Sequence, residues 1–261
     1  MELKDTAGAA TESAASRVAL ITGASRGIGA ATARLLAARG MRVVVNYRSS
    51  AAEADDVVGS IRSTGGQAMA VRADVRDHAA VSAMAAQIAT AWGGVDVLVH
   101  NALIPYAIKS FAEITWEELG GKIDQEMRAA FEVTKSVLPA MIERRYGRIV
   151  YLGTGLSQRP RAGMIALGTA KAALTQFARF IAQEVGVDGI TVNVVAPGPV
   201  DETSMADVLG QAHKQRQAAA TALGRMATPD DVARVVAFYA GDDSAFVTGI
   251  SAPVNGGLAM D

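Results

Sequence analysis

Short apolar runs alternate with longer segments of helical periodicity along most of the chain. The runs are rich in Val and Ile and have the length of buried parallel strands; they lie at residues 17–22, 42–46, 67–72, 95–100, 147–152, 190–195 and 250–254. Between them, apolar residues recur at helical spacing and predict helices over residues 27–39, 51–62, 77–91, 115–144, 163–184 and 229–240. This alternation predicts an α/β fold: a doubly wound parallel sheet with helices on both faces, in a single domain.

Composition adds limits to this picture. The chain has 261 residues, 50% of them hydrophobic and 20% charged, which suits one globular domain over residues 17–261. Its net charge of -1 gives no electrostatic reason to expect a nucleic acid or a membrane surface as partner, and with no cysteine there is no Cys-ligated metal to expect. Residues 1–16 lack an apolar signal core. We expect them to be a disordered segment of a cytoplasmic protein.

Three glycines, Gly23, Gly27 and Gly29, lie where the first predicted strand turns into the first predicted helix. Glycines in this context let the backbone turn tightly and approach a pyrophosphate, which rests on the helix N-terminus. The alternative is a tight turn without a ligand. The residues expected to contact a dinucleotide here are Gly23, Ser25, Arg26, Gly27, Ile28 and Gly29.

The end of the second predicted strand distinguishes the two nicotinamide cofactors. An acidic residue there would hold the ribose 2′-hydroxyl and repel a 2′-phosphate. The chain has Arg48 and Ser49 instead, and Arg48 with Arg26 can bind a 2′-phosphate through charge-assisted hydrogen bonds. The sequence therefore favours NADP(H), the alternative being two solvated arginines.

The segment from Thr22 to Gly29, with glycines spaced as G-x-x-x-G-x-G, resembles the fingerprint of the short-chain dehydrogenase/reductase family. The resemblance extends from about residue 17 to the end of the chain, includes the 3-oxoacyl-carrier-protein reductases and implies a Rossmann-type fold. It implies an adenine site and a nicotinamide site, and a substrate lid over residues 201–223. The residues it assigns to the cofactor in these two sites are Asp74, Val75, Asn101, Ala102, Lys171, Pro197, Gly198, Val200 and Thr203.

The catalytic positions of the family are altered here. The family uses a Tyr as acid/base, a Lys one helical turn later that also holds the nicotinamide ribose, a Ser that polarises the carbonyl, and an Asn that places a relay water. The resemblance puts Lys171 at the lysine position, but Leu167 at the tyrosine, Thr154 at the serine and Glu126 at the asparagine. The chain thus resembles a divergent member without the catalytic tyrosine.

Other side chains could supply the missing proton. Glu126 could do so if it were buried beside few other charges, which would raise its pKa; alternatively it neutralises Lys171. Tyr106, just after the fourth predicted strand, is a second candidate. Tyr151 either reaches the pocket mouth or packs in the core, and we expect the core. His100 we expect to be a packed histidine.

Two main functions fit these residues. The first is an NADPH-dependent reductase that acts on an activated C=C, C=N or carbonyl group of a small molecule, because loss of a general acid typically costs about 10²–10⁴-fold and such substrates depend on it less. The alternative is a catalytically silent NADP(H)-binding homologue that acts as a sensor or partner subunit, and a weaker one is a non-redox catalyst. The two long predicted helices, at residues 115–144 and 163–184, resemble the assembly surfaces of the family, which implies a homodimer or homotetramer.

Overall fold

The computed structural model describes residues 17–203 and 210–260. One parallel sheet of seven strands forms its centre, in the order β3-β2-β1-β4-β5-β6-β7. The strands, in chain order, are β1 (Val18–Ile21), β2 (Arg42–Tyr47), β3 (Ala68–Arg72), β4 (Val97–His100), β5 (Gly147–Leu152), β6 (Ile190–Pro197) and β7 (Ser251–Val254). The predicted fold class is confirmed.

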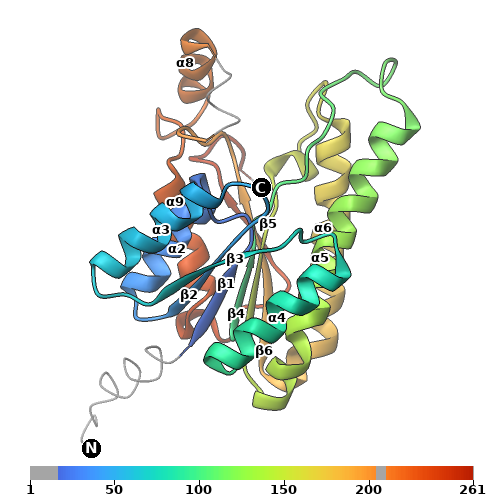
Figure 1. Ribbon diagram of the computed structural model, residues 1–261. Coiled ribbons are helices and arrows are strands. Elements are labelled where there is room, and N and C mark those ends of the chain that lie inside the picture. Colours follow the sequence, from blue (N-terminus) through green and yellow to red (C-terminus); the bar gives the residue numbers. More distant parts are fainter. Residues whose placement is uncertain (1–16, 204–209, 261) are drawn as a thin grey trace, which may run out of the picture.

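Helices cover both faces of this sheet (Figure 1). One layer consists of α2 (Gly27–Ala38), α3 (Ala51–Ser63) and α9 (Pro229–Tyr239), and the other of α4 (His78–Trp92), α5 (Trp116–Arg144) and α6 (Ile165–Val185). Two hydrophobic clusters, one per face, lie between the sheet and these layers. The strands read as continuous apolar runs because both of their faces are buried.

Local sequence signals set the helix ends. The longest helix, α5, has 29 residues and begins with a capping box, in which Thr115 and Glu118 satisfy each other's backbone amides. The Asp77 side chain accepts hydrogen bonds from the amides of Ala79 and Ala80 and so caps α4. These caps fix where each helix leaves the loop that precedes it.

The order of the strands determines where a ligand can bind. From β1 the chain moves outward through β2 and β3, then returns to form β4 on the other side of β1. In sheets of this kind ligands bind beyond the carboxyl ends of the strands, at the point where the strand order reverses. The loops after β1 and β4 meet at that point.

A cluster of four side chains lies at the amino ends of the strands, the end of the sheet opposite to the glycine loop. The guanidinium groups of Arg17 and Arg148 lie 4.2 and 4.4 Å from the centre of the Tyr146 ring. Both arginines also form ion pairs with Asp242, at 2.7 and 3.2 Å. The cluster joins the residue before β1 to β5 and to the turn after α9.

The segment between β6 and α9 differs from the expectation. It contains a helix, α8 (Gln211–Ala219), that the apolar pattern did not predict, because α8 buries none of its residues. Residues 1–16 and residues 204–209 of the predicted lid lie outside the described residues. Within residues 17–203 and 210–260, no helix is long and apolar enough to cross a membrane.

Candidate active site

The glycine loop after β1 is packed too closely for side chains. Gly23 has a φ of +61°, and a Cβ built on it would lie 2.8 Å from the Cα of Ala102. A Cβ on Gly29 would lie 2.6 Å from Nδ2 of Asn101 and 2.7 Å from the Gly23 carbonyl oxygen. Glycine is therefore required at both positions of this loop, which leads into the N-terminus of α2.

Asn101 holds this loop in place from β4. Its Nδ2 donates hydrogen bonds to the carbonyl oxygens of Thr22 and Gly23, each at 3.0 Å. The backbone amides of Asn101 and Ala102 both donate to the Thr22 hydroxyl, at 3.0 Å. The structure thus brings Gly23, Asn101 and Ala102 together, as expected of one cofactor site.

The remaining residues of the loop lie around the first turn of α2. Arg26 is exposed, and its extended backbone begins the helix without a side-chain cap. Ser25 and Ile28 are half-buried, and a Cβ on Gly27 would lie 3.7 Å from Cγ2 of Thr203. Thr203, at the start of the predicted lid, therefore lies over the glycine loop.

Asn46 at the end of β2 joins the glycine loop to β3. Its Oδ1 accepts a hydrogen bond from the Gly23 amide at 3.3 Å, and its Nδ2 donates to the Ala73 carbonyl at 3.1 Å. Arg48 and Ser49, directly beyond, are exposed. An exposed cation with no acid on the same strand end suits a phosphate more than a free ribose.

Asp74, expected beside the adenine, is fixed by an arginine. Arg76 donates to both of its carboxylate oxygens, at 2.9 and 2.6 Å, and also to Oε1 of Gln125 on α5 at 2.7 Å. These hydrogen bonds outweigh partial burial and lower the pKa of Asp74 to about 2. The side chain of Val75, next in the chain, is buried in the core below α4.

The loop after β6 is the third part of the predicted cofactor site. Pro197 ends the strand, and the amide of Gly198 donates to the Val254 carbonyl at 3.0 Å. Val200 forms an isolated parallel bridge with Ala227, and the Thr203 hydroxyl donates to the Val200 carbonyl at 3.2 Å. Backbone contacts with the C-terminal part of the chain therefore shape this loop.

Lys171 lies in a buried cluster of charges. Its Nζ donates to the carbonyl oxygen of Leu152 at 2.5 Å and lies 2.7 Å from Oε1 of Glu126. The other carboxylate oxygen of Glu126 accepts from Nζ of Lys122, one helical turn earlier on α5. The three side chains are 4%, 0% and 1% exposed, for Lys171, Glu126 and Lys122 respectively.

The expectation that the pKa of Glu126 is raised is wrong. Burial on its own would raise this pKa, but the two ammonium groups of Lys171 and Lys122 outweigh it and hold the pKa well below its usual range. The condition of few neighbouring charges is not met. Glu126 is therefore a permanent carboxylate that pairs with Lys171, as in the alternative interpretation.

Leu167 lies one turn before Lys171 on α6 and is 6% exposed. Its side chain has no ionisable group, so it offers no proton at this point of the helix. Thr154, after β5, is half-buried, and its Oγ1 accepts from the amide of Leu156 at 3.3 Å. Its hydroxyl hydrogen can still be donated elsewhere.

Tyr106 lies in the loop between β4 and α5. It is half-buried, and its ring centre is 5.5 Å from Nζ of Lys122. Burial raises the pKa of the phenol, although nearby Arg161 opposes this. The phenol is therefore protonated at neutral pH and can donate a hydrogen bond.

The two other aromatic residues at the strand ends pack as expected. Tyr151 is fully buried and its hydroxyl pairs with that of Thr134 at 2.6 Å. His100 is also buried, with its ring against that of Tyr151, and burial next to Lys171 lowers its pKa to about 4. Both predictions of core packing are confirmed.

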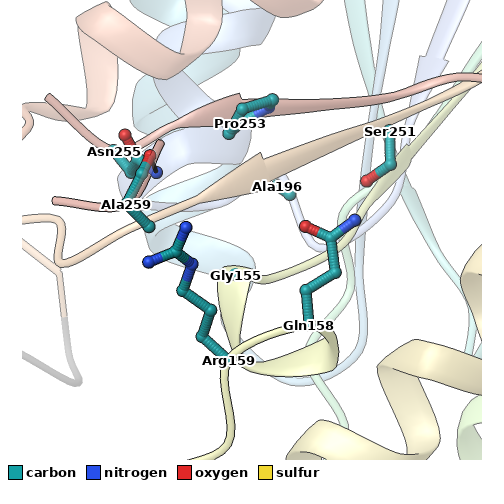
Figure 2. Close-up of a pocket in the computed structure, with 8 residues that line it drawn as sticks. All are labelled: Gly155, Gln158, Arg159, Ala196, Ser251, Pro253, Asn255 and Ala259. Carbon is teal, nitrogen blue, oxygen red and sulfur yellow. Dashed lines mark hydrogen bonds between the residues drawn. The ribbon is translucent and has the colours of Figure 1, made fainter. Parts of the chain in front are cut away.

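A small pocket lies beside β6 and β7, where the side chains of Gln158 and Arg159 approach the strands (Figure 2). The lining residues are Gly155, Gln158, Arg159, Ala196, Ser251, Pro253, Asn255 and Ala259. Arg159 donates to the carbonyl oxygen of Met260. None of the eight is a predicted site residue, so this pocket is separate from the glycine loop. In the described ranges no cluster of His, Asp or Glu is arranged to hold a metal ion.

Two cations of the site, Lys122 and Arg76, are not among the residues predicted from the sequence. Lys122 is four residues before Glu126, which is the spacing of a helical ion pair, and it lies in the apolar stripe of α5. Arg76 is two residues after Asp74. Spacing relative to an already predicted acid would have indicated both.

Known proteins match nearly the whole length of this chain. Residues 23–259 match the model of a family described as enoyl-(acyl carrier protein) reductase. The 3-oxoacyl-acyl-carrier-protein reductase FabG of Escherichia coli (strain K12) is 34% identical over 248 residues, covering 94% of this chain and 98% of the relative. The FabG protein of Vibrio cholerae is 36% identical with the same coverage.

Solved structures also match nearly the whole chain. A short-chain dehydrogenase/reductase variant from Serratia marcescens superposes with a TM-score of 0.85 at 31% identity, over 94% of this chain and 98% of the other. A blue fluorescent protein from a metagenomic library, in complex with NADPH, has the same TM-score and coverage at 37% identity.

Proposed function

The chain belongs to the short-chain dehydrogenase/reductase family, and we propose that it is an NADP(H)-dependent oxidoreductase with an atypical active site. Its substrate is a small molecule with an activated C=C, C=N or carbonyl group. The observation that carries this proposal is the combination of a close-packed glycine loop with a buried Leu167 one turn before Lys171.

The residues around the glycine loop fit a dinucleotide. The backbone at Gly23 and Gly29 is left bare by contacts that exclude a Cβ, and the N-terminus of α2 attracts phosphate. Arg48 is exposed where a 2′-phosphate would lie. Nζ of Lys171 donates one hydrogen bond, to the Leu152 carbonyl, and its contact with Glu126 is an ion pair without hydrogen-bond geometry, so N–H donors remain for a ribose hydroxyl. When bound, the cofactor supplies or accepts a hydride.

Few of the predicted site residues can donate a proton to a substrate. Leu167 has no proton to give, and Glu126 is ionised between two lysines. The hydroxyl of Thr154 can polarise a substrate oxygen, and among the predicted site residues Tyr106 offers a phenol that can release a proton. Conjugate reduction or imine reduction demands such a proton less than reduction of an isolated ketone, which favours activated substrates.

A second function has a specific observation in its favour. The Glu126 carboxylate pairs with two lysines, and Lys171 also binds the Leu152 carbonyl, so these groups are engaged by the protein itself. That arrangement is what a catalytically silent NADP(H)-binding sensor or partner subunit would have.

One experiment distinguishes the two. NADPH binding to the purified protein is measured by fluorescence titration, and turnover is followed at 340 nm with enones, quinones, cyclic imines and simple ketones. We expect binding, with turnover of enones or imines exceeding that of simple ketones, and a loss of roughly 10²–10⁴-fold in Tyr106→Phe if this phenol donates the proton. Binding without turnover on the whole panel would instead establish the silent binder.

Assembly is part of the same proposal. An open groove on α5 and α6 is lined by Ile123, Asp124, Met127, Arg128, Phe131, Glu132 and Phe177. Phe131 is 48% exposed there and lies with the partly buried Met127 and Phe177 in one apolar patch that charged side chains surround. We assign this face to a homodimer or homotetramer, and Phe131→Asp should shift the mass measured by light scattering towards the monomer.

The lid assignment, residues 201–223, belongs to this proposal as well. Lys214 on α8 forms an ion pair with Asp201 at 2.6 Å and so ties α8 to the start of the segment. We expect limited proteolysis within this segment to slow when NADPH and a substrate are added together.

A further inference from the structure

A continuous line of polar contacts joins the loop after β4 to the end of β5. Nζ of Lys122 donates to the Ile104 carbonyl at 2.8 Å and to Glu126, Glu126 pairs with Lys171 at 2.7 Å, and Lys171 donates to the Leu152 carbonyl at 2.5 Å. The line thus runs from one strand end to the next through α5 and α6.

We propose that Lys122 is a positioning residue, which orders the β4–α5 loop and the Lys171 ammonium as one unit. The proposal rests on the function assigned above in so far as Lys171 faces the cofactor. The link between the loop and Lys171 holds whether or not the protein turns over a substrate.

Charge balance explains why Lys122 is needed. Each oxygen of the Glu126 carboxylate takes one ammonium, so the carboxylate cannot rotate towards either lysine alone. All three groups are almost fully buried, and water is therefore a poor replacement for any of them. Without Lys122, one oxygen of Glu126 lacks its partner. The carboxylate that pairs with Lys171 is then no longer held in one orientation.

The contacts of Lys122 with the loop are equally specific. Its ammonium donates a hydrogen bond to the carbonyl oxygen of Ile104, a buried residue in the loop that follows β4. The same ammonium lies over the ring of Tyr106. Tyr106 is the phenol proposed above as the proton donor. Its place therefore depends on the same ammonium that fixes Glu126.

The loop has a second anchor that serves as a matched control. Nζ of Lys109 pairs with Glu118 in the first turn of α5 at 2.5 Å, with side chains 43% and 30% exposed. This pair restrains the far end of the same loop. The contact between Lys109 and Glu118 does not connect to Lys171. Lys109→Met therefore perturbs the loop without cutting the proposed link.

The test compares Lys122→Met, Lys109→Met, Glu126→Gln and the double variant Lys122→Met/Glu126→Gln. Amide hydrogen exchange over residues 101–109 is measured without cofactor, and the Kd for NADPH is measured by titration on each variant at matched folded fraction. We expect Lys122→Met to accelerate exchange over residues 101–109 and to raise the Kd about tenfold. Lys109→Met should accelerate exchange near residue 109 and leave the Kd within about twofold of the wild type.

The double variant tests whether Lys122 acts through Glu126. If it does, adding Lys122→Met to Glu126→Gln leaves the Kd nearly unchanged, because the link is already cut. Additive effects, wild-type exchange in Lys122→Met, or an equal rise in Kd for Lys109→Met would each overturn the proposal.

If Lys122→Met does not fold, the double variant replaces it, and wild-type exchange over residues 101–109 would then overturn the proposal. If the wild-type protein does not bind NADPH, the proposed function fails, whereas the exchange measurement still decides the link.

Discussion

Replacing Glu126 by Gln removes one negative charge from between two buried ammonium groups. The glutamine keeps the shape of the side chain, but Lys122 and Lys171 are then left as two buried cations, 1% and 4% exposed, without a counter-charge. Breaking a buried pair in this way typically costs about 3–5 kcal/mol. An upper limit follows from neutralising one lysine at pH 7, which costs about 1.4 kcal/mol per pH unit below its ordinary pKa, or about 5 kcal/mol in all.

The free energy of unfolding of the Glu126→Gln variant should depend on pH in a different way from that of the wild type. A neutral lysine in the folded variant gains a proton on unfolding, so the stability of the variant should rise with pH by up to about 1.4 kcal/mol per unit between pH 7 and pH 9. In the wild type, the folded pKa of Glu126 lies below its unfolded value. Its contribution is therefore complete above about pH 4.3 and is lost as the pH falls towards about 2. The stability difference between the two proteins should narrow at both ends of the range.

Urea denaturation followed by circular dichroism, at pH values from 3 to 9, measures this difference directly. Lys135→Met is the control, since Lys135 is an exposed lysine on the same helix. A Glu126→Gln variant with wild-type stability at pH 7, or a deficit that does not change up to pH 9, would refute the buried charge cluster.

Three further changes test the rest of the site. Leu167→Tyr restores a phenol one turn before Lys171; we expect ketone reduction at 340 nm to increase by roughly 10²-fold or more, at a stability cost of about 1–3 kcal/mol for the larger side chain, and no gain would mean that the pocket lacks more than an acid. Arg48→Glu should abolish the preference for NADPH over NADH, which the ratio of the two Kd values measures; an unchanged ratio would exclude Arg48 from the 2′-phosphate site. Gly29→Ala places a methyl 2.7 Å from the Gly23 carbonyl, so NADPH titration should show little or no binding, with Gly59→Ala, where a Cβ meets nothing within 4 Å, as the control.

The sequence predicts the fold well because burial dictates its pattern. Strands covered by helices on both faces are apolar throughout, and the helices between them bury one stripe each, so both kinds of element leave a clear signal. The helix α8 leaves none, because none of its residues is buried. An exposed helix has no apolar stripe from which to be predicted.

The site was predictable only where its chemistry depends on the backbone. The glycines of the loop after β1 are required by close approach, and their spacing is visible in the sequence. The pKa of Glu126, in contrast, depends on how many cations surround it in space. The i,i+4 spacing of Lys122 and Glu126 indicates an ion pair, but it does not show that Lys171 lies beside the same carboxylate. The two ammonium charges together lower the pKa of Glu126, against the direction that was expected.

The cluster of Arg17, Tyr146, Arg148 and Asp242 has a practical consequence for handling the protein. It fastens the residue before β1 to the amino ends of the strands, which lie opposite the glycine loop. An affinity handle, a fused reporter or a solid support joined ahead of Arg17 would thus be attached on the far side from the cofactor loops. Immobilisation through that end should leave the glycine loop facing the solution, whereas coupling through lysines could engage Lys214 of the proposed lid.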